Sequence, residues 1–260
     1  MSKKYNFFFD IDGTLITGGS IIPSDAVLQA LRYAKSKGCR VFLNTGRTKA
    51  TLPPTLTELD CIDGILCGCG TYIECNGKPI LERYLDANEL YRIAKLYDAH
   101  KMESCLIFEG VDTVYYYDER FYAFADIPFY KIESPEEILT RFADTKINKF
   151  TLQVLTDKDE AFVSEISDKY TPTKCHNYWE IISKGFDKGR AIQLTEELLG
   201  LDHAETVAVG DSANDIKMLE YAPISVAMGN APDNVKAICT MVTDSVKNDG
   251  VAKMIYEIVK

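Results

Sequence analysis

The chain has 260 residues, 46% of them hydrophobic, which is enough to bury one large core or two modest ones. Its formal net charge of -10 argues against nucleic acid or an anionic membrane as a partner, because both would repel it. No apolar run reaches the length of a membrane span, and the N-terminus leads into a predicted strand instead of a signal peptide. We therefore expect a cytoplasmic protein whose eight cysteines stay as free thiols.

The first predicted strand runs over residues 5–9 and stops at two carboxylates, Asp10 and Asp12. A short apolar run is typical of a strand covered on both faces in a parallel sheet, where ligands bind at the carboxyl ends of the strands. On an extended backbone the two side chains point the same way, and their charges repel without a cation between them. Gly13 allows a sharp turn there. The alternative is that both aspartates only shape a turn.

A helix and a second strand follow. Pro23-Ser24 is predicted to open the helix, Gly38 to end it, and its apolar stripe comprises Val27, Leu28, Leu31 and Ala34. The second strand covers residues 40–43 and leads into Thr45 and Gly46. A hydroxyl beside a backbone N–H suits a phosphoryl oxygen, whereas the alternative makes Thr45 a helix cap.

The next elements are a helix over 53–59, a strand over 64–67 and a hairpin over 72–81 on an Asn-Gly turn. Three cysteines in this stretch, Cys67, Cys69 and Cys75, raise the possibility of a zinc site. The spacing disfavours it, because Cys67 and Cys69 alternate along a predicted strand and no fourth ligand is suitably placed.

Residues 83–183 differ in composition and contain aromatic clusters such as Tyr115-Tyr116-Tyr117. Helices are predicted over 88–99, 135–143 and 160–169, and strands over 105–109, 113–117, 149–155 and 178–182. Given the acidic charge, the tyrosines are interpreted as packing and sheet surface, not as a stacking platform for bases.

The last part returns to alternating helices and strands. A helix over 191–199 is closed by Gly200, and a buried strand over 206–209 ends at Gly210-Asp211. Asn214 and Asp215 are predicted in the first turn of the next helix, where a carboxylate also serves the helix dipole. Lys188 lies just before a helix and, taken alone, reads as an exposed helix lysine.

Four segments, in this order, resemble the motifs of the haloacid dehalogenase-like phosphohydrolase superfamily. They are Asp10-Ile11-Asp12-Gly13-Thr14, Phe42-Leu43-Asn44-Thr45-Gly46-Arg47, Lys184-Gly185-Phe186-Asp187-Lys188-Gly189 and Val209-Gly210-Asp211-Ser212-Ala213-Asn214-Asp215. Any one motif is weak evidence, but four in order are a strong signal. The hairpin and the C-terminal tail are similar to the Cof-type branch, with its α/β C2-type cap. That branch usually has Asn-Gly where this chain has Cys69-Gly70.

The resemblance implies an α/β fold: a doubly wound, Rossmann-like core with a mostly parallel sheet over residues 1–82 and 184–260. An inserted α/β cap over 83–183 would set substrate specificity. The implied activity is Mg²⁺-dependent hydrolysis of small phosphate monoesters, sugar phosphates first, through an aspartyl-phosphate. Asp10 would be the nucleophile, Asp12 the general acid and base, and Lys188 the charge-balancing residue. The implied metal ligands are Asp10, Asp12 through its carbonyl, Asp211 and, in support, Asp215. The implied phosphate-binding residues are Thr45, Gly46, Lys188 and Asn214.

Other readings remain open. Pyridoxal phosphate or flavin mononucleotide could replace a sugar phosphate as substrate, and a phosphomutase would use the same core. A binding protein without turnover is disfavoured by the intact catalytic aspartates and lysine. Arg47 suits either a phosphate or an acidic partner, and His176 and Trp179 suit either the leaving group or packing. The expected partner is a small phosphate ester bound to a monomer or weak homodimer.

Overall fold

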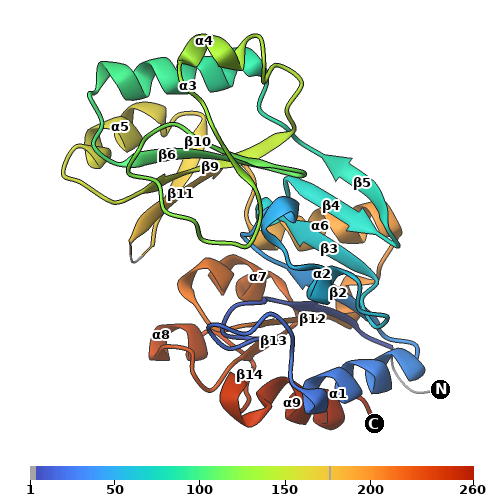
Figure 1. Ribbon diagram of the computed structural model, residues 1–260. Coiled ribbons are helices and arrows are strands. Elements are labelled where there is room, and N and C mark those ends of the chain that lie inside the picture. The colour runs from blue at the N-terminus through green and yellow to red at the C-terminus, as the bar shows by residue number, and fades with distance from the viewer. Residues whose placement is uncertain (1–3, 176) are drawn as a thin grey trace. The chain divides into compact units, whose positions relative to one another are not determined.

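The computed structural model describes residues 4–175 and 177–260, so that His176, one candidate for the leaving-group contact, lies outside the described residues. The chain divides into two compact units (Figure 1). The first comprises the described residues of Met1–Gly46, Leu52–Leu81 and Asp187–Lys260, and the second comprises Arg47–Thr51 and Glu82–Phe186. The prediction assigned residues 47–51 to the core. They group with the second unit because Ala50 packs on the apolar cluster of Cys105, Ile107 and Val114.

The first unit is built on an eight-stranded sheet whose first six strands are parallel. In spatial order the strands are β14 (Met241–Val242), β13 (Ile224–Ala227), β12 (Thr206–Gly210), β1 (Asn6–Phe9), β2 (Arg40–Asn44), β3 (Gly64–Cys67), β4 (Tyr72–Cys75) and β5 (Lys78–Glu82). Strand β4 runs antiparallel to β3. The order reverses between β1 and β12, which confirms the doubly wound, mostly parallel architecture predicted from the sequence.

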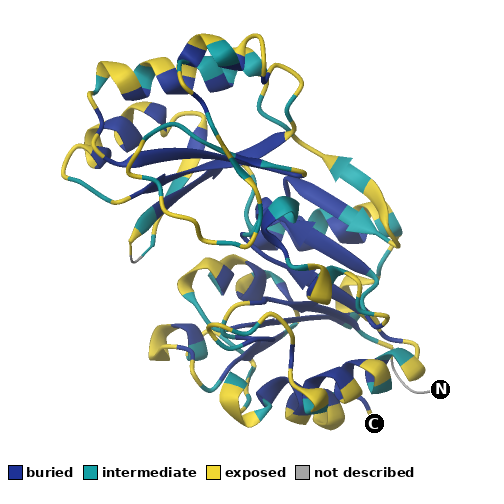
Figure 2. Ribbon diagram, in the orientation of Figure 1, coloured by how far each residue is buried: buried dark blue, intermediate teal, exposed yellow. Residues whose placement is uncertain are grey.

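Helices cover both faces of this sheet. Helices α1 (Asp25–Ser36) and α9 (Gly250–Ile258) pack on each other on one side. The other side carries α6 (Lys188–Leu199), α7 (Ile216–Tyr221) and α8 (Asp233–Lys236), while the short α2 (Pro54–Thr57) follows β2. Figure 2 shows the central strands fully buried and the helices exposed on their outer sides.

The aromatic run of β1 explains why this strand lies in the middle of the sheet. Phe8 stacks on Phe42 of β2, with ring centroids 4.8 Å apart, beneath α6 and α7. Phe7 and Phe9 point to the opposite face and stack on each other at 5.7 Å. All of these rings are essentially inaccessible to water. Truncating one of them to alanine would cost about 3–5 kcal/mol of stability, so the run fixes the strand that carries Asp10.

The loops after β3 and β4 show one success and one error of the prediction. Asn76 and Gly77, at φ 49° and 72°, form the expected two-residue hairpin turn between β4 and β5. Cys69, however, is not on a strand: it lies in the 3₁₀ turn η2 (Gly68–Gly70) with φ 53°. Gly70 explains the break, because a side chain there would be 2.7 Å from Ala191 of α6.

The second unit has a six-stranded sheet, antiparallel except for the β7–β8 pair. In spatial order its strands are β10 (Tyr170–Lys174), β11 (Tyr178–Ser183), β9 (Ile147–Gln153), β6 (Cys105–Gly110), β7 (Val114–Tyr116) and β8 (Phe129–Lys131). The edge strands β8 and β10 were not predicted, and β10 contains Pro172, which an edge strand tolerates. Strand β9 begins two residues earlier than predicted.

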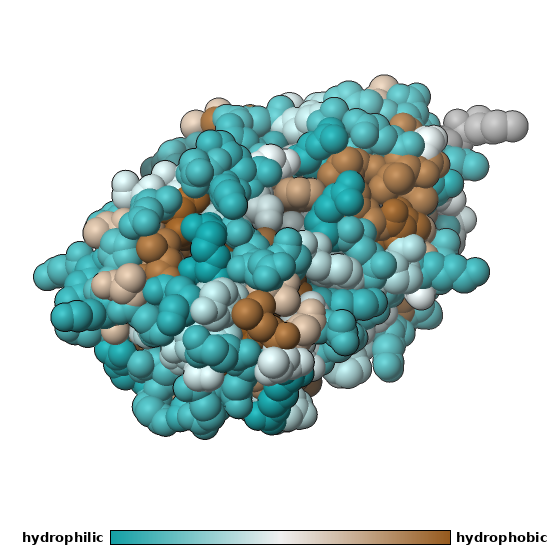
Figure 3. Space-filling view, turned by 90° about the horizontal axis from the view of Figure 1, so that it is seen from above, coloured by the Kyte–Doolittle hydropathy of each residue, from teal (hydrophilic) through white to brown (hydrophobic). Residues whose placement is uncertain are grey.

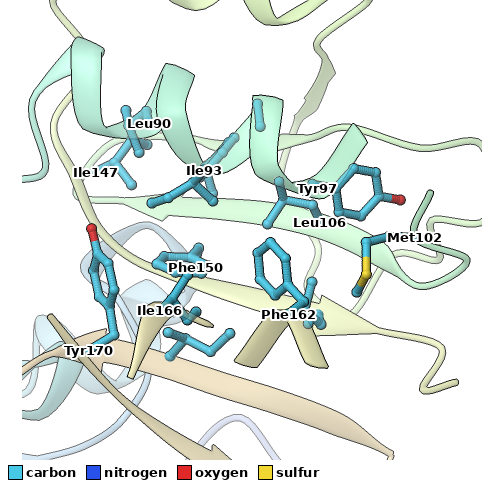
Figure 4. Packing of buried hydrophobic residues seen from close by; sticks show 14 of the residues in the cluster. Leu90, Ile93, Tyr97, Met102, Leu106, Ile147, Phe150, Phe162, Ile166 and Tyr170 are labelled. Atoms are coloured by element: carbon cyan, nitrogen blue, oxygen red, sulfur yellow. The ribbon is translucent and has the colours of Figure 1, made fainter. Parts of the chain in front are cut away.

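Helices α3 (Ala87–Ala99), α4 (Pro135–Ile138) and α5 (Asp159–Ile166) cover one face of this sheet. Figure 4 shows the core between them, where Ile93 of α3 and Phe162 of α5 point toward Phe150 of β9. Trp179 belongs to the same cluster and is 8% exposed, so its role is packing and not leaving-group contact. Tyr115 and Tyr117 also pack against this core.

Short 3₁₀ turns complete the described chain, among them η1 (Lys49–Thr51), η3 (His203–Glu205), η4 (Ala213–Asp215) and η5 (Val246–Asn248). The face of the molecule seen in Figure 3 is largely hydrophilic and carries several apolar patches, of which the one at the upper right is the broadest. Among the described residues, no helix combines the length and the hydrophobicity needed to cross a bilayer.

Candidate active site

The predicted motif residues gather at the carboxyl edge of the first unit's sheet. Asp10 directly follows β1, Thr45 follows β2 and Asp211 follows β12. The three strands are neighbours in register, with Phe9 opposite Leu43 and Val209. The N–H of Asp10 donates to the carbonyl of Val209 at 2.9 Å, which extends the ladder by one residue. Parallel pairing therefore places these side chains at adjacent strand ends.

Two glycines allow the carboxylates to come together. Gly13 has φ +87°, and a Cβ at this position would lie 2.3 Å from Oδ2 of Asp211. A Cβ at Gly210 would lie 2.6 Å from the side chain of Asp215. Such distances are not tolerated, so glycine at both positions is a condition for the approach of the aspartates.

Asp10, Asp211 and Asp215 form the acidic cluster of the site. Each offers one carboxylate oxygen, and these oxygens lie within 4.8 Å of one another. Asp10 is 4% exposed and Asp215 is fully buried. Asp211 accepts hydrogen bonds from Oγ1 of Thr14 at 3.3 Å and from Nδ2 of Asn230 at 3.1 Å.

Lys188 is the cation inside this cluster. Its Nζ lies 2.6 Å from Oδ1 of Asp10 and 2.6 Å from Oδ1 of Asp215, and it donates to Oδ1 of Asn214 at 3.3 Å. The residue is 1% exposed, so the structure rules out an exposed helix lysine. Asp187 caps the helix that begins at Lys188, because its Oδ1 accepts from the N–H of Arg190 at 2.8 Å.

Burial and like charge shift the titration of this cluster. Desolvation, followed by the charge of Asp215, raises the pKa of Asp10 to about 8. The same two causes raise the pKa of Asp211 to about 6. Burial opposes the charge on Lys188, but Asp10 and Asp215 outweigh it and hold the pKa of the ammonium above its ordinary value. Lys188 thus contacts two of the three carboxyl groups, and with all three ionised the cluster carries more negative than positive charge.

The donor set fits a divalent, oxygen-preferring cation. Mg²⁺ is bound by one or two carboxylates together with other oxygens, and its charge would relieve the repulsion that raises the two pKa values. Asp215 is the most constrained of the three, because Oδ1 binds Lys188 while Oδ2 accepts the N–H groups of Asp211 and Ser212 at 2.9 Å each. Asp215 is therefore suited to orienting the loop, and Asp10 and Asp211 are better suited to direct ligation.

The remaining predicted residues lie around this cluster. Asp12 is exposed and forms a β-bridge with Ile16 in the loop after β1. Thr45 is 2% exposed, and its N–H donates to the carbonyl of Leu66 at 2.9 Å, which leaves that N–H unavailable to another acceptor. Gly46 is buried beside it. Asn214 is exposed and lies in η4, a 3₁₀ turn before α7, not in the first α-helical turn as predicted.

Two residues that hold the site were not assigned a role from the sequence. Thr14 lies inside the first motif, and its hydroxyl donates to Asp211, which is 197 residues away in the sequence. Asn230 follows β13 and donates to both the carbonyl of Gly13, at 2.9 Å, and Asp211. Asn230 could have been predicted from its position shortly after a buried strand, because parallel strands end at the same edge of the sheet and that edge carries the site.

Arg47, for which phosphate binding and ion pairing were equally open, donates to the carbonyl of Thr51 at 3.4 Å within the segment that groups with the second unit. This contact lies within the segment Arg47–Thr51 and favours neither phosphate binding nor ion pairing by Arg47.

Comparison with known proteins relates this site to phosphatases. A family model described as haloacid dehalogenase-like hydrolase matches residues 7–255. The chain is 27% identical to the 5-amino-6-(5-phospho-D-ribitylamino)uracil phosphatase YitU of Bacillus subtilis, over 98% of each chain. It is 27% identical to the pyridoxal phosphate phosphatase YbhA of Escherichia coli, over 95% of this chain and 96% of the relative.

A solved structure described as the subclass IIB sugar phosphatase BT4131 is also similar, at 26% identity and a TM-score of 0.83, covering 98% of this chain and 100% of the other. The family model spans almost the whole chain, including every motif residue at the sheet edge. On these grounds the chain belongs to the haloacid dehalogenase-like hydrolase family, in its Cof-type branch, and is a phosphoric monoester phosphatase.

Proposed function

We propose that the protein is a Mg²⁺-dependent phosphatase that hydrolyses small phosphate monoesters, with sugar phosphates as the preferred class, through an aspartyl-phosphate. The observation that supports this most directly is the buried contact of Lys188 with Asp10 and Asp215, beside Asp211. A phosphate dianion repels nucleophiles, so a site that holds a carboxylate ready must supply positive charge around it.

The cation would be held by Asp10, Asp211 and the backbone carbonyl of Asp12, with Asp215 orienting the loop. When bound, Mg²⁺ supplies charge neutralisation at the phosphoryl oxygens and fixes the phosphate relative to the nucleophile. Lys188 supplies further positive charge from the side of Asp10 and Asp215.

In the first step an oxygen of Asp10 attacks phosphorus. Because Lys188 engages Oδ1, we assign the attack to Oδ2. The new bond joins Asp10 to phosphorus, the bond from phosphorus to the ester oxygen breaks, and Asp12 gives its proton to the departing alcohol. Asp12 is exposed, which lets it exchange protons with solvent.

In the second step water attacks the phosphorus of the aspartyl-phosphate. Asp12, now a carboxylate, takes the proton of that water, and the bond between Asp10 and phosphorus breaks to release inorganic phosphate. The hydroxyl of Thr45, the N–H of Gly46 and the amide of Asn214 are proposed to bind the equatorial oxygens throughout. All three belong to loops that begin at the same sheet edge.

For the leaving group we propose recognition by the second unit, on the sheet face that its helices leave uncovered. Phe108, Phe150 and Ile181 are register partners in the core under the helices, so their neighbours along each strand face the other way. That opposite face carries polar side chains that are themselves buried, namely Glu109, Lys149, Thr151, Gln153 and Glu180. Lys149 lies 2.7 Å from Glu180 and 3.5 Å from Glu109. Such a set suits hydroxyl groups, which both donate and accept.

A cofactor phosphate is the second candidate substrate, favoured by an aromatic cluster on the same unit. Tyr116 and Phe121 are stacked with centroids 4.3 Å apart, and Phe129 lies 4.8 Å from Phe121. Their apolar surface joins that of Ile107, which shares the helix-free face. An aromatic leaving group such as pyridoxal would stack there, in keeping with the similarity to the pyridoxal phosphate phosphatase YbhA.

The decisive experiment measures hydrolysis of a chromogenic phosphate ester by the purified protein, first treated with a chelator and then given Mg²⁺. We expect turnover only with Mg²⁺, and a loss of at least about a thousandfold in Asp10→Asn with an unchanged melting temperature, because nucleophiles contribute on this scale. Asp144→Asn, an exposed substitution in the second unit, is the control. Activity of Asp10→Asn near that of the control would show that the nucleophile lies elsewhere.

Substrate class is tested with a panel of metabolite phosphates. Sugar phosphates are expected to have higher kcat/KM than pyridoxal phosphate or flavin mononucleotide, and Glu180→Gln should reduce that preference. The reverse ranking, combined with loss of pyridoxal phosphate turnover in Phe121→Ala, would favour the cofactor class instead.

A further inference from the structure

Asn44, the last residue of β2, has a hydrogen-bonding pattern that stability does not explain. Its side chain is completely buried. Nδ2 donates to the backbone carbonyl of Lys188 at 2.9 Å, whereas Oδ1 is buried and accepts no hydrogen bond. A buried acceptor without a partner destabilises the folded state, and an apolar side chain of the same shape would avoid that cost.

The carbonyl that Asn44 contacts does not need it as a donor. Lys188 is the first residue of α6, and in an α-helix its carbonyl accepts the N–H four residues further along. The bond from Asn44 is therefore additional. Its effect is to tie the start of α6 to the end of β2, next to the strand that presents Asp10.

The same amide also contacts the element that follows Asp215. Nδ2 of Asn44 lies 3.4 Å from Sδ of Met218 in α7, and Asp215 immediately precedes that helix. The two helices are close here, since a Cβ on Gly189 would lie 2.6 Å from the carbonyl of Lys217. Asn44 thus contacts both α6, which begins with Lys188, and α7, which follows Asp215. These are the two segments that the Lys188–Asp215 contact joins.

We propose that Asn44 is a positioning residue that fixes the backbone of Lys188 so that its ammonium meets the oxygens of Asp10 and Asp215 at 2.6 Å each. This inference rests on the proposed function, because it assigns Asn44 a role through Lys188. Placement matters at this scale, since a displacement of about 1 Å of a catalytic group can cost about a hundredfold in rate.

The test replaces Asn44 with leucine, which has a similar shape and cannot donate. We expect Asn44→Leu to melt at the same temperature as the wild type or higher, because the buried unpaired oxygen is gone. We also expect kcat for a chromogenic phosphate ester to fall about tenfold or more, with KM changed less than about twofold. A structural role predicts the opposite, namely a lower melting temperature and unchanged kcat.

Asn148 is a matched control. It is 2% exposed, its Nδ2 donates to the backbone carbonyl of Arg83 at 3.0 Å, and its Oδ1 is likewise unpaired, but it lies in the second unit. Asn148→Leu should keep the wild-type kcat while its melting temperature also stays equal or rises. An equal loss of kcat in both variants would show a general effect of buried asparagines and overturn the proposal.

Lys188→Met separates this inference from the proposed function. If Lys188→Met retains wild-type kcat, the role proposed for Lys188 fails, and that of Asn44 fails with it. If Lys188→Met loses turnover while Asn44→Leu keeps kcat, the proposed function stands and the inference about Asn44 is wrong. Vanadate, a phosphoryl transition-state mimic, should inhibit Asn44→Leu more weakly in proportion to the loss of kcat/KM, while inhibition by inorganic phosphate changes less.

Discussion

At the scale of single residues, backbone conformation and charge act together in this protein. Gly13 is the clearest case, because its positive φ and its missing side chain both serve the carboxylate of Asp211. The same loop donates the hydroxyl of Thr14 to that carboxylate. Gly13 is thus required both by the backbone of the turn and by the position of the Asp211 carboxylate.

Gly13→Ala is predicted to damage activity beyond its effect on the fold. A Cβ 2.3 Å from Oδ2 of Asp211 must displace that carboxylate, so we expect a loss of at least about tenfold in kcat/KM. Gly19→Ala is the matched control, because Gly19 has the same φ of +87° with nothing within 4 Å of its would-be Cβ. Both variants should lose about 1–2 kcal/mol of stability from the left-handed backbone. Equal activity in the two, measured with a chromogenic ester, would contradict the prediction.

At the scale of elements, helix ends and side-chain bridges join parts distant in sequence. Ser24 caps α1, where its Oγ accepts from the N–H of Val27 at 3.2 Å. The same hydroxyl donates to Oδ1 of Asp249, the residue before α9, at 2.6 Å. One serine therefore stabilises the packing of the first helix on the last.

Ser24→Ala should lower the free energy of unfolding by about 1 kcal/mol, the usual cost of losing a helix cap. For a domain of this size that corresponds to roughly 2–4 °C in melting temperature. Ser134 also occupies an N-cap position, at α4, but its side chain makes no capping bond. Ser134→Ala should consequently leave the melting temperature unchanged, and an equal shift in both variants would argue against a specific cap at Ser24.

Glu89 of α3 makes the stability of the second unit depend on pH. Hydrogen bonds from Arg92, and then from Tyr170 of β10 at 2.7 Å, lower its pKa from 4.5 to about 2. A lowered pKa means that the ionised form stabilises the fold above about pH 4.5, and that this contribution is lost as the pH falls from there toward 2.

Glu89→Gln is accordingly expected to melt a few degrees below the wild type at pH 6 and much closer to it at pH 3. Thermal melts at the two pH values test this. Glu160→Gln is the control, because Glu160 pairs only at the surface with Lys174, where both side chains are more than half exposed. A difference between wild type and Glu89→Gln that is as large at pH 3 as at pH 6 would refute the linkage.

At the scale of the whole molecule, the distribution of charge sets the requirement for a cation. The chain has a formal net charge of -10, and its acidic cluster brings together Asp10, Asp211 and Asp215, of which only Asp10 and Asp215 contact the ammonium of Lys188. Folding must therefore bring like charges together in a poorly solvated place. A bound dication would offset that cost, so its effect should be visible in the stability of the protein.

Mg²⁺ at a hundredfold excess over its dissociation constant is predicted to stabilise the protein by about 2.7 kcal/mol. Thermal melts of the chelator-treated protein, with and without Mg²⁺, measure this as a rise of several degrees. Asp211→Asn should largely abolish the rise. Potassium chloride at the same ionic strength controls for screening, and an equal rise with either salt would mean that no specific site is involved.

Most of the first unit could be predicted from the amino-acid sequence. The aromatic run before Asp10, the glycine turns and each of the four motifs are local signals, because each is formed by residues that are neighbours in the sequence. They predicted the parallel sheet, most helices, and the strand ends at which Asp10, Thr45 and Asp211 lie. The edge strands β8 and β10 escaped because short, partly exposed strands carry little hydrophobic pattern.

The contacts between these residues could not be predicted without the folded structure. The contacts of Lys188 with Asp10, of Thr14 with Asp211 and of Asn44 with Lys188 each span well over a hundred positions in sequence. No local pattern encodes such pairs, because their distances depend on strand register and helix packing. The grouping of Arg47–Thr51 with the second unit has the same origin, since the apolar surface that holds Ala50 is formed by residues that come much later in the chain.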